Sequence, residues 1–439
     1  MALLHADDFA FATQQVLSDS AISALFTERL GLLPTRILAS PSQGAFHKVY
    51  FVSLGEGSNS PWSGRDVVLR VARRTINKVK TENEMALLRV LRAAGIPVPE
   101  VVFFCADPDN PLKYEYNCLE RISYPSLADT WPRLSPAQLD FVLDQSVDIF
   151  IKMWSIDVPR MHGSLRVDGT SGPVIEETMW TLPDITRYFH AAPYNLTAET
   201  FATLNPTESY TSWPAYICAF LRTYAHVVAI HPSVDWLRDL LPPLQRVITI
   251  LATDSADMPW VRRLCDTPEL LPRLFHRDFH FGNILADEAG SIKAVIDWEF
   301  AGIGPSLASR ASPTRNILGY FRTLPASSRP PNTQHLIDTW EAAFLARLAE
   351  RSPEIASQWA RELDRATVLG VEGGSVYYCP PLFSPPFSNP NDMHANSLPG
   401  TERPTRVPAS LPRDRRARGG GLGVRPKWKQ RKGLIGMSW

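Results

Sequence analysis

The chain has 439 residues, of which 44% are hydrophobic and 21% charged, and its 45 basic side chains balance its 45 acidic ones. This composition is typical of a soluble globular protein. No apolar run approaches the roughly 20 residues that a membrane span requires. The length suits one large two-lobed domain or two ordinary domains.

The first ten residues contain Asp7 and Asp8 and lack an apolar stretch, so the sequence predicts no secretory or mitochondrial presequence. The five cysteines are scattered, odd in number and form no CxxC pair, which argues against structural zinc and favours a reducing compartment. We therefore expect a cytoplasmic protein.

The N-terminal part predicts a helix at residues 9–30, ended by Gly31, and then two strands within residues 37–54 that meet at a turn over residues 42–45. A strand at 66–72, a helix at 79–94 closed by Gly95, and strands at 101–105 and 116–122 follow in that order. This pattern predicts an antiparallel sheet accompanied by a helix.

Beyond residue 123 the pattern becomes mainly helical, because five segments repeat their apolar residues every 3.6 positions. These segments are residues 136–154, 214–230, 234–251, 332–348 and 353–369. Residues 161–210 are less regular and predict a loop-rich insertion. The tryptophans of the helical part, Trp213, Trp236, Trp260 and Trp340, are expected in its core, and the alternative is that they line a less polar acceptor pocket.

The C-terminal end has a different composition. Residues 380–412 contain nine prolines, and residues 401–439 hold 11 Lys and Arg against 2 Asp and Glu. We expect this Pro-rich and then basic tail to be disordered. Its basic charge is the one feature that points to nucleic acid, and such tails are more often simply solvated, so the sequence does not favour a nucleic-acid partner.

The most informative stretch lies between residues 274 and 298. It places Asp278 and Asn283 on one loop, and Asp297 at the end of an apolar run. Residues 287–290 predict a turn, so residues 284–286 and 292–296 should pair as a hairpin that brings Asn283 and Asp297 side by side. Two carboxylates and an amide in this order are what a phosphoryl-transfer site requires. The plainer alternative is a loop cap, a turn residue and a strand-end carboxylate.

At these residues the chain resembles the aminoglycoside phosphotransferase-like small-molecule kinases, particularly their fungal branch. Residues 276–283 are similar to the family's His-Gly-Asp-x-His-x-x-Asn, with Arg277 in place of the glycine. Asp297-Trp298-Glu299 stands where protein kinases carry Asp-Phe-Gly. The resemblance covers residues 35–305 or so.

The resemblance implies an α+β, bilobal protein-kinase-like fold. An N-terminal helix (residues 1–34) would precede an N-lobe with an antiparallel sheet and a helix (35–122). A mainly helical C-lobe with an insertion (123–370) and the tail (371–439) would follow. The implied activity is transfer of the γ-phosphoryl group of ATP to a hydroxyl of a small molecule, with GTP the less favoured donor.

For the catalytic side, the resemblance implies that Asp278 orients the acceptor hydroxyl and takes its proton, while Asn283 and Asp297 hold Mg²⁺. His276 and His280 are expected to organise the loop through hydrogen bonds.

For the nucleotide side, Gly44 would let backbone amides approach the phosphates. Arg70 stands where kinases carry a phosphate-binding lysine, and Glu84, or the neighbouring Glu82, would position it. The hinge that reads adenine would use backbone groups of Glu120 and Ile122. Because arginine does not simply replace lysine, the alternative is a non-catalytic module that binds a nucleotide or another ligand. Neither the acceptor nor the oligomeric state follows from the sequence.

Overall fold

The computed structural model describes residues 16–41, 46–57, 60–76, 78–252, 272–305 and 333–368. Its first element is helix α1 (Asp19–Leu30), which starts where the Ser18 side chain accepts a hydrogen bond from the amide of Ala21 and ends at Gly31 with φ of +68°. The predicted helix began earlier, at residue 9, but residues 1–15 lie outside the described part of the chain. The C-terminal stop is as predicted.

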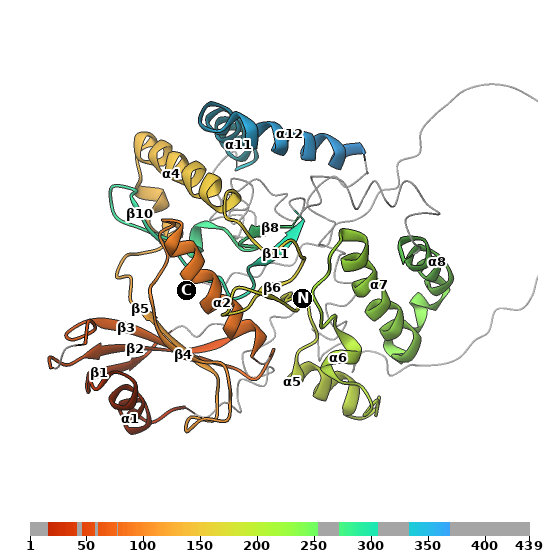
Figure 1. Ribbon diagram of the computed structural model, residues 1–439, viewed down its shortest axis with the longest axis horizontal. Coiled ribbons are helices and arrows are strands. Elements are labelled where there is room, and N and C mark those ends of the chain that lie inside the picture. The colour runs from red at the N-terminus through yellow and green to blue at the C-terminus, as the bar shows by residue number, and fades with distance from the viewer. Residues whose placement is uncertain are drawn as a thin grey trace, which may run out of the picture.

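The N-lobe sheet contains β1 (Pro34–Ala39), β2 (His47–Leu54), β3 (Asp66–Ala72), β4 (Val101–Cys105) and β5 (Tyr116–Glu120), in the antiparallel order β1-β2-β3-β5-β4. Alternate side chains of β3 point to opposite faces. Leu69 packs with Ile22 and Phe26 of α1, whereas Arg70 meets Glu84 of helix α2 (Val79–Ala93). The two helices therefore cover opposite faces of the sheet (Figure 1).

The other helices of the described residues are α3 (Leu127–Thr130), α4 (Pro136–Trp154), α5 (Leu182–Ile185), α6 (Phe201–Leu204), α7 (Trp213–Ile230), α8 (Leu241–Ala252), α11 (Thr333–Arg351) and α12 (Pro353–Val368). Short 3-10 segments are η3 (Trp131–Arg133), η5 (Pro232–Leu240) and η7 (Phe281–Asn283), and η4 (Thr186–His190) is a π turn. None of these helices is long and apolar enough to cross a membrane.

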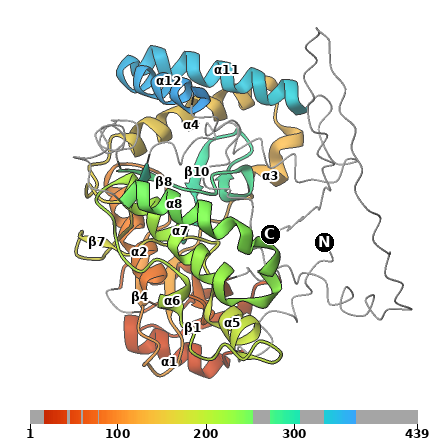
Figure 2. The same ribbon diagram turned by 90° about the vertical axis from the view of Figure 1, so that its right-hand side faces the viewer.

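The core cluster that joins the two lobes contains Met85 of α2, Phe150 of α4, Ile284 at the end of the loop of residues 276–283, Phe344 of α11 and Trp359 of α12. In Figure 2 helices α4, α11 and α12 lie together at one end of the molecule, and the sheet with α1 lies at the other. The α+β, bilobal architecture expected from the sequence is confirmed.

Two expectations for the helical part were wrong. Residues 234–251 do not form one helix: 3-10 helix η5 ends at Leu240 and α8 begins at Leu241. Pro242 and Pro243 lack an amide hydrogen, so they fit the first turn of a new helix but not the interior of a continuous one. Trp340 is in the core, but Trp236 is 73% exposed. Trp260 lies outside the described residues.

Two small antiparallel strand pairs flank the loop of residues 276–283. Strand β9 (Ile284–Ala286) pairs with β10 (Ile292–Val295) as predicted, and the Asp287 carboxylate closes the turn by accepting from the amides of Ala289 and Ser291. Strand β8 (Pro272–Phe275) pairs with β11 (Gly302–Pro305), which was not predicted. The insertion adds β6 (Ser164–Leu165) and β7 (Ser171–Gly172). The domain limits proposed from the sequence stay predictions, and the tail from residue 371 lies outside the described residues.

Candidate active site

His276 organises the start of the loop formed by residues 276–283. Its Nε2 lies 2.9 Å from the carbonyl oxygen of Ile296, and its Nδ1 accepts from the amide of Asp278 at 3.3 Å. One ring nitrogen therefore donates and the other accepts, as only a neutral imidazole can do. Burial lowers the pKa of His276 from 6.5 to about 4, although the bond to Ile296 opposes the shift. A neutral His276 thus ties the loop to the strand that leads to Asp297.

Asp278 is held by two neighbours on the same loop. Asn283 donates its amide hydrogens to the carbonyl oxygen of Asp278 at 2.9 Å and to Oδ2 of Asp278 at 3.1 Å. His280 Nε2 lies 3.3 Å from the same Oδ2. Burial raises the pKa of Asp278, but the bonds and charge from His280 and Asn283 outweigh it, so the pKa lies below its ordinary value. The carboxylate is still 61% exposed and can meet a ligand.

The hairpin brings Asn283 and Asp297 to the same end, as its predicted pairing requires. Ile284 pairs with Val295, and the amide of Ile296 donates to the carbonyl oxygen of Asn283 at 2.9 Å. Asp297 itself adopts φ of +67°, a left-handed conformation that aspartate tolerates better than most residues. Because Asn283 uses its amide nitrogen on Asp278, its amide oxygen can face a cation.

Burial, with the nearby charge of Glu299, raises the pKa of Asp297 well above its ordinary value, and Arg70 opposes this shift. Oδ1 of Asp297 lies 3.7 Å from Nη2 of Arg70. A divalent cation would favour the ionised carboxylate, and oxygen ligands from carboxylate and amide groups suit Mg²⁺. The residues present therefore fit the metal that the sequence implies.

On the nucleotide side, Arg70 forms an ion pair with Glu84. Glu82, the other candidate, instead lies 3.8 Å from the exposed Lys78. Burial alone would lower the pKa of Arg70, but the charges of Glu84, Glu299 and Asp297 raise it by a larger amount. The net pKa lies above the ordinary value for arginine, so the guanidinium stays protonated. Figure 1 shows α2, which carries Glu84, between the sheet and the hairpins.

The hinge candidates lie at the end of strand β5: Glu120 is its last residue, and Ile122 lies just beyond it. The amide of Glu120 donates to the carbonyl oxygen of Glu100 at 2.9 Å, and the Glu120 side chain accepts from the amide of Glu100 at 3.2 Å. The Glu120 amide is therefore already paired within the protein. Gly44 lies outside the described residues.

Two ion pairs near the candidate site, at residues 277 and 299, were not predicted from the sequence. Arg277, at the position of the family's glycine, forms an ion pair with Glu176 of the insertion, and the Tyr216 hydroxyl donates to Glu176 at 2.5 Å. Lys80 of α2 forms a buried ion pair with Glu299. The spacing of Lys80 four residues before Glu84 could have indicated that both share one helical face.

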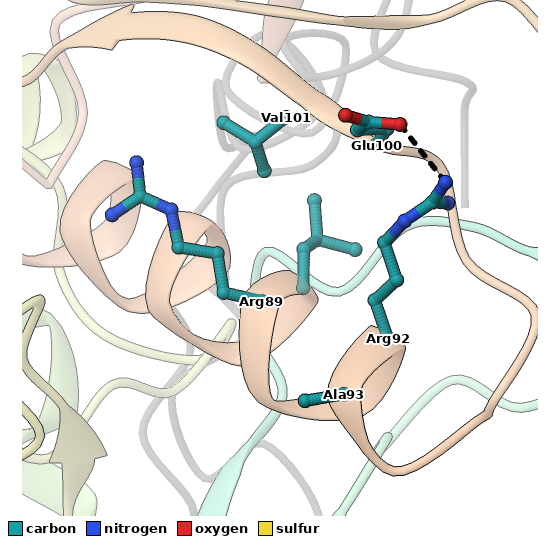
Figure 3. A pocket seen from close by; sticks show the side chains of 6 residues that line it. Arg89, Arg92, Ala93, Glu100 and Val101 are labelled. Carbon is teal, nitrogen blue, oxygen red and sulfur yellow. Dashed lines mark hydrogen bonds and ion pairs between the residues drawn. The ribbon is translucent and has the colours of Figure 1, made fainter.

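A separate pocket of about 380 Å³ lies between α2 and β4. Its lining residues are Leu88, Arg89, Arg92, Ala93, Glu100 and Val101. Figure 3 shows Arg92 reaching Glu100, which it meets at 2.9 Å. None of the candidate site residues lines this pocket, so it is not part of the candidate active site.

With this geometry in place, the chain can be compared with known proteins. The profile of the phosphotransferase enzyme family matches residues 39–308, which is more than half of the chain. The chain therefore belongs to the phosphotransferase enzyme family.

The curated relatives include two subtelomeric hrmA-associated cluster proteins, from two strains of Aspergillus fumigatus. Each is 23% identical over 325 residues, which cover 63% of this chain and 60% of the relative. The chain thus spans about 60% of the length of these relatives.

Among solved structures, a thermostable mutant of aminoglycoside phosphotransferase APH(4)-Ia, in ternary complex with ADP and hygromycin B, is 18% identical with a TM-score of 0.40. The match covers 81% of this chain and 95% of that chain. The streptomycin-ATP-APH(2")-IIa ternary complex is 13% identical with a TM-score of 0.39, over 82% of this chain and 99% of that chain.

Proposed function

We propose that the protein is an ATP-dependent phosphotransferase that transfers the γ-phosphoryl group to a hydroxyl of a small molecule. The observation that carries this proposal is that three kinds of functional group lie at one end of the β9–β10 hairpin. Asp278 is a held but exposed carboxylate, Asn283 and Asp297 supply oxygen ligands, and Arg70 brings a permanent positive charge within 3.7 Å of Asp297.

In this proposal Asp278 positions the acceptor hydroxyl and takes up its proton as the phosphoryl group is transferred. Its low pKa keeps it ionised at neutral pH, so its main contribution is orientation of the hydroxyl toward the phosphorus atom. Arg70, held by Glu84, neutralises charge on the phosphates. Backbone groups of Glu120 and Ile122 would bind the adenine edge, and Gly44 would lie near the phosphates.

Asn283 and Asp297 would hold Mg²⁺. The bound ion would supply positive charge that offsets negative charge on the phosphates during transfer. The cytoplasmic location in this proposal rests on the cysteines, because Cys105, Cys118 and Cys218 carry free thiols.

The test is calorimetric titration of the purified protein with ATP, with and without Mg²⁺, repeated on two variants. Asp297→Ala is expected to lose Mg²⁺-dependent ATP binding. Asp278→Asn is expected to keep ATP binding but to lose ADP release when acceptor alcohols are screened. Asp109→Ala removes a carboxylate that is 88% exposed and serves as the control. Undiminished Mg²⁺-dependent binding by Asp297→Ala would refute the metal role.

A second candidate is a binding module without useful catalysis. It is favoured by one observation: Arg70 stands where kinases carry a phosphate-binding lysine. The Arg70–Glu84 ion pair speaks for the catalytic proposal, because it is the contact that a working phosphate-binding cation would make. Arg70→Lys decides between the two. If transfer rises from nothing in the variant, the natural chain is the non-catalytic module. If wild-type transfer falls in the variant, arginine is the functional residue.

A further inference from the structure

Lys80 is a buried lysine in the first turn of α2, with 1% of its surface exposed. Its ammonium donates to Oε2 of Glu299, which is itself only 6% exposed. The rings of Phe46 and Phe300 flank the ammonium, with centroids 5.5 Å and 5.7 Å away. Removing two charges from water costs about as much as their attraction returns, so a buried ion pair is weak support for stability. A role in positioning is the more informative explanation.

The ion pair holds the segment that carries Asp297. This residue has φ of +67°, so the surrounding structure must stabilise its conformation. Two residues further on, Glu299 is bound by Lys80, and four residues further on the carbonyl oxygen of Ala301 accepts from the Asn83 side chain at 2.7 Å. Helix α2 therefore binds the segment that follows Asp297 at two residues, Glu299 and Ala301.

The same face of α2 also positions the phosphate-binding cation. Lys80 and Glu84 are four residues apart and so lie next to each other on the helix surface. Glu84 binds Arg70, and Lys80 binds Glu299. His47 joins the two pairs, since its Nδ1 lies 3.2 Å from Nη2 of Arg70 and 3.3 Å from Oε2 of Glu299. One face of α2 thus fixes the position of Arg70, through Glu84, and that of the segment after Asp297, through Lys80.

We propose that Lys80 is a positioning residue for the metal-binding carboxylate. Through Glu299 it keeps Asp297 in place against Arg70, so that Mg²⁺-dependent nucleotide binding depends on a lysine that contacts neither ligand. This inference rests on the proposed function, because it concerns Mg²⁺ and ATP at the same site. It predicts a loss specific to the metal-dependent part of binding.

The experiment measures the affinity for ATP by calorimetry, with and without Mg²⁺, in the full-length wild type, Lys80→Met and Lys78→Met. Lys78 is two residues away, and its side chain is 66% exposed, so its variant is the matched control. Lys80→Met is expected to weaken Mg²⁺-dependent ATP binding about 10- to 100-fold, as losses of residues that orient metal ligands do. Its binding of ATP without Mg²⁺, and all binding by Lys78→Met, should match the wild type.

Lys80→Met leaves Glu299 as a buried, unpaired charge, which can prevent folding. The double variant Lys80→Met/Glu299→Gln carries neither charge and is measured alongside by thermal unfolding and calorimetry. We expect it to recover thermal stability and still to show the weakened Mg²⁺ dependence, because the ion pair that holds the segment at residue 299 is absent.

The outcomes separate the two proposals. Wild-type Mg²⁺ dependence in a folded Lys80→Met, or in the double variant where the single one does not fold, overturns the positioning role alone. A loss of affinity that is equal with and without Mg²⁺ also overturns it, since it would reflect general damage to the lobe. No ATP binding by the wild type under any condition overturns the proposed function, and this inference with it.

Discussion

The neutral state of His276 makes a prediction about the pH dependence of stability. The pKa of this imidazole is about 4 in the folded protein, against an ordinary value of 6.5 in the unfolded chain. Between these two values the unfolded chain binds a proton that the folded protein does not. The folded state therefore loses stability as the pH falls from 6.5 toward 4. For one histidine with these values, the loss between pH 7 and pH 5 is about 2 kcal/mol.

The substitution His276→Phe tests this explanation. It keeps a ring against Trp298, whose centroid is 4.3 Å from that of His276, but removes both ring nitrogens. The carbonyl of Ile296 loses its imidazole partner, whereas the amide of Asp278 loses one of two acceptors and keeps the carbonyl oxygen of residue 276, which is 2.8 Å away. A buried group left unpaired costs about 1–3 kcal/mol, so the free energy of unfolding at pH 7 should fall by about that amount.

The measurement is urea unfolding of both proteins at pH 7, 6 and 5, followed by tryptophan fluorescence. Other groups titrate in this range, but they are common to both proteins, so the difference between the two isolates the imidazole. That difference should shrink by about 2 kcal/mol from pH 7 to pH 5. His335→Phe, at an exposed imidazole, is the matched control. A difference that stays constant with pH would refute a buried, neutral His276.

Two further substitutions test how the site is supported. Asn83→Ala removes the hydrogen bonds to the amide of Leu165 and the carbonyl of Ala301, and should lower the free energy of unfolding by about 2–5 kcal/mol in urea titrations. A loss below about 1 kcal/mol would contradict the bridging role. Gly290→Ala should cost at least about 1 kcal/mol more than Gly169→Ala in thermal unfolding. Both glycines have φ near +80°, but only at Gly290 would a Cβ approach a backbone oxygen, at 3.1 Å. Equal losses would mean that backbone conformation alone demands glycine.

The sequence by itself determined much of the fold, because local patterns report local structure. The short apolar run at residues 66–72 predicted a strand whose limits are those observed for β3, and Gly31 predicted the end of α1. The turn at residues 287–290 predicted the β9–β10 hairpin, and so placed Asn283 beside Asp297. These features depend on residues within about a dozen positions of one another, where spacing alone constrains geometry.

The sequence could not reveal contacts between distant segments. The pairing of β8 with β11, the Arg277–Glu176 link and the exposure of Trp236 all depend on how elements pack, and no local period encodes packing. Lys80 shows the physical reason most clearly. No local pattern marks this lysine as buried, and 219 positions separate it from the carboxylate that binds it. Only the tertiary structure buries that lysine, because only the folded core brings α2 against the segment after Asp297.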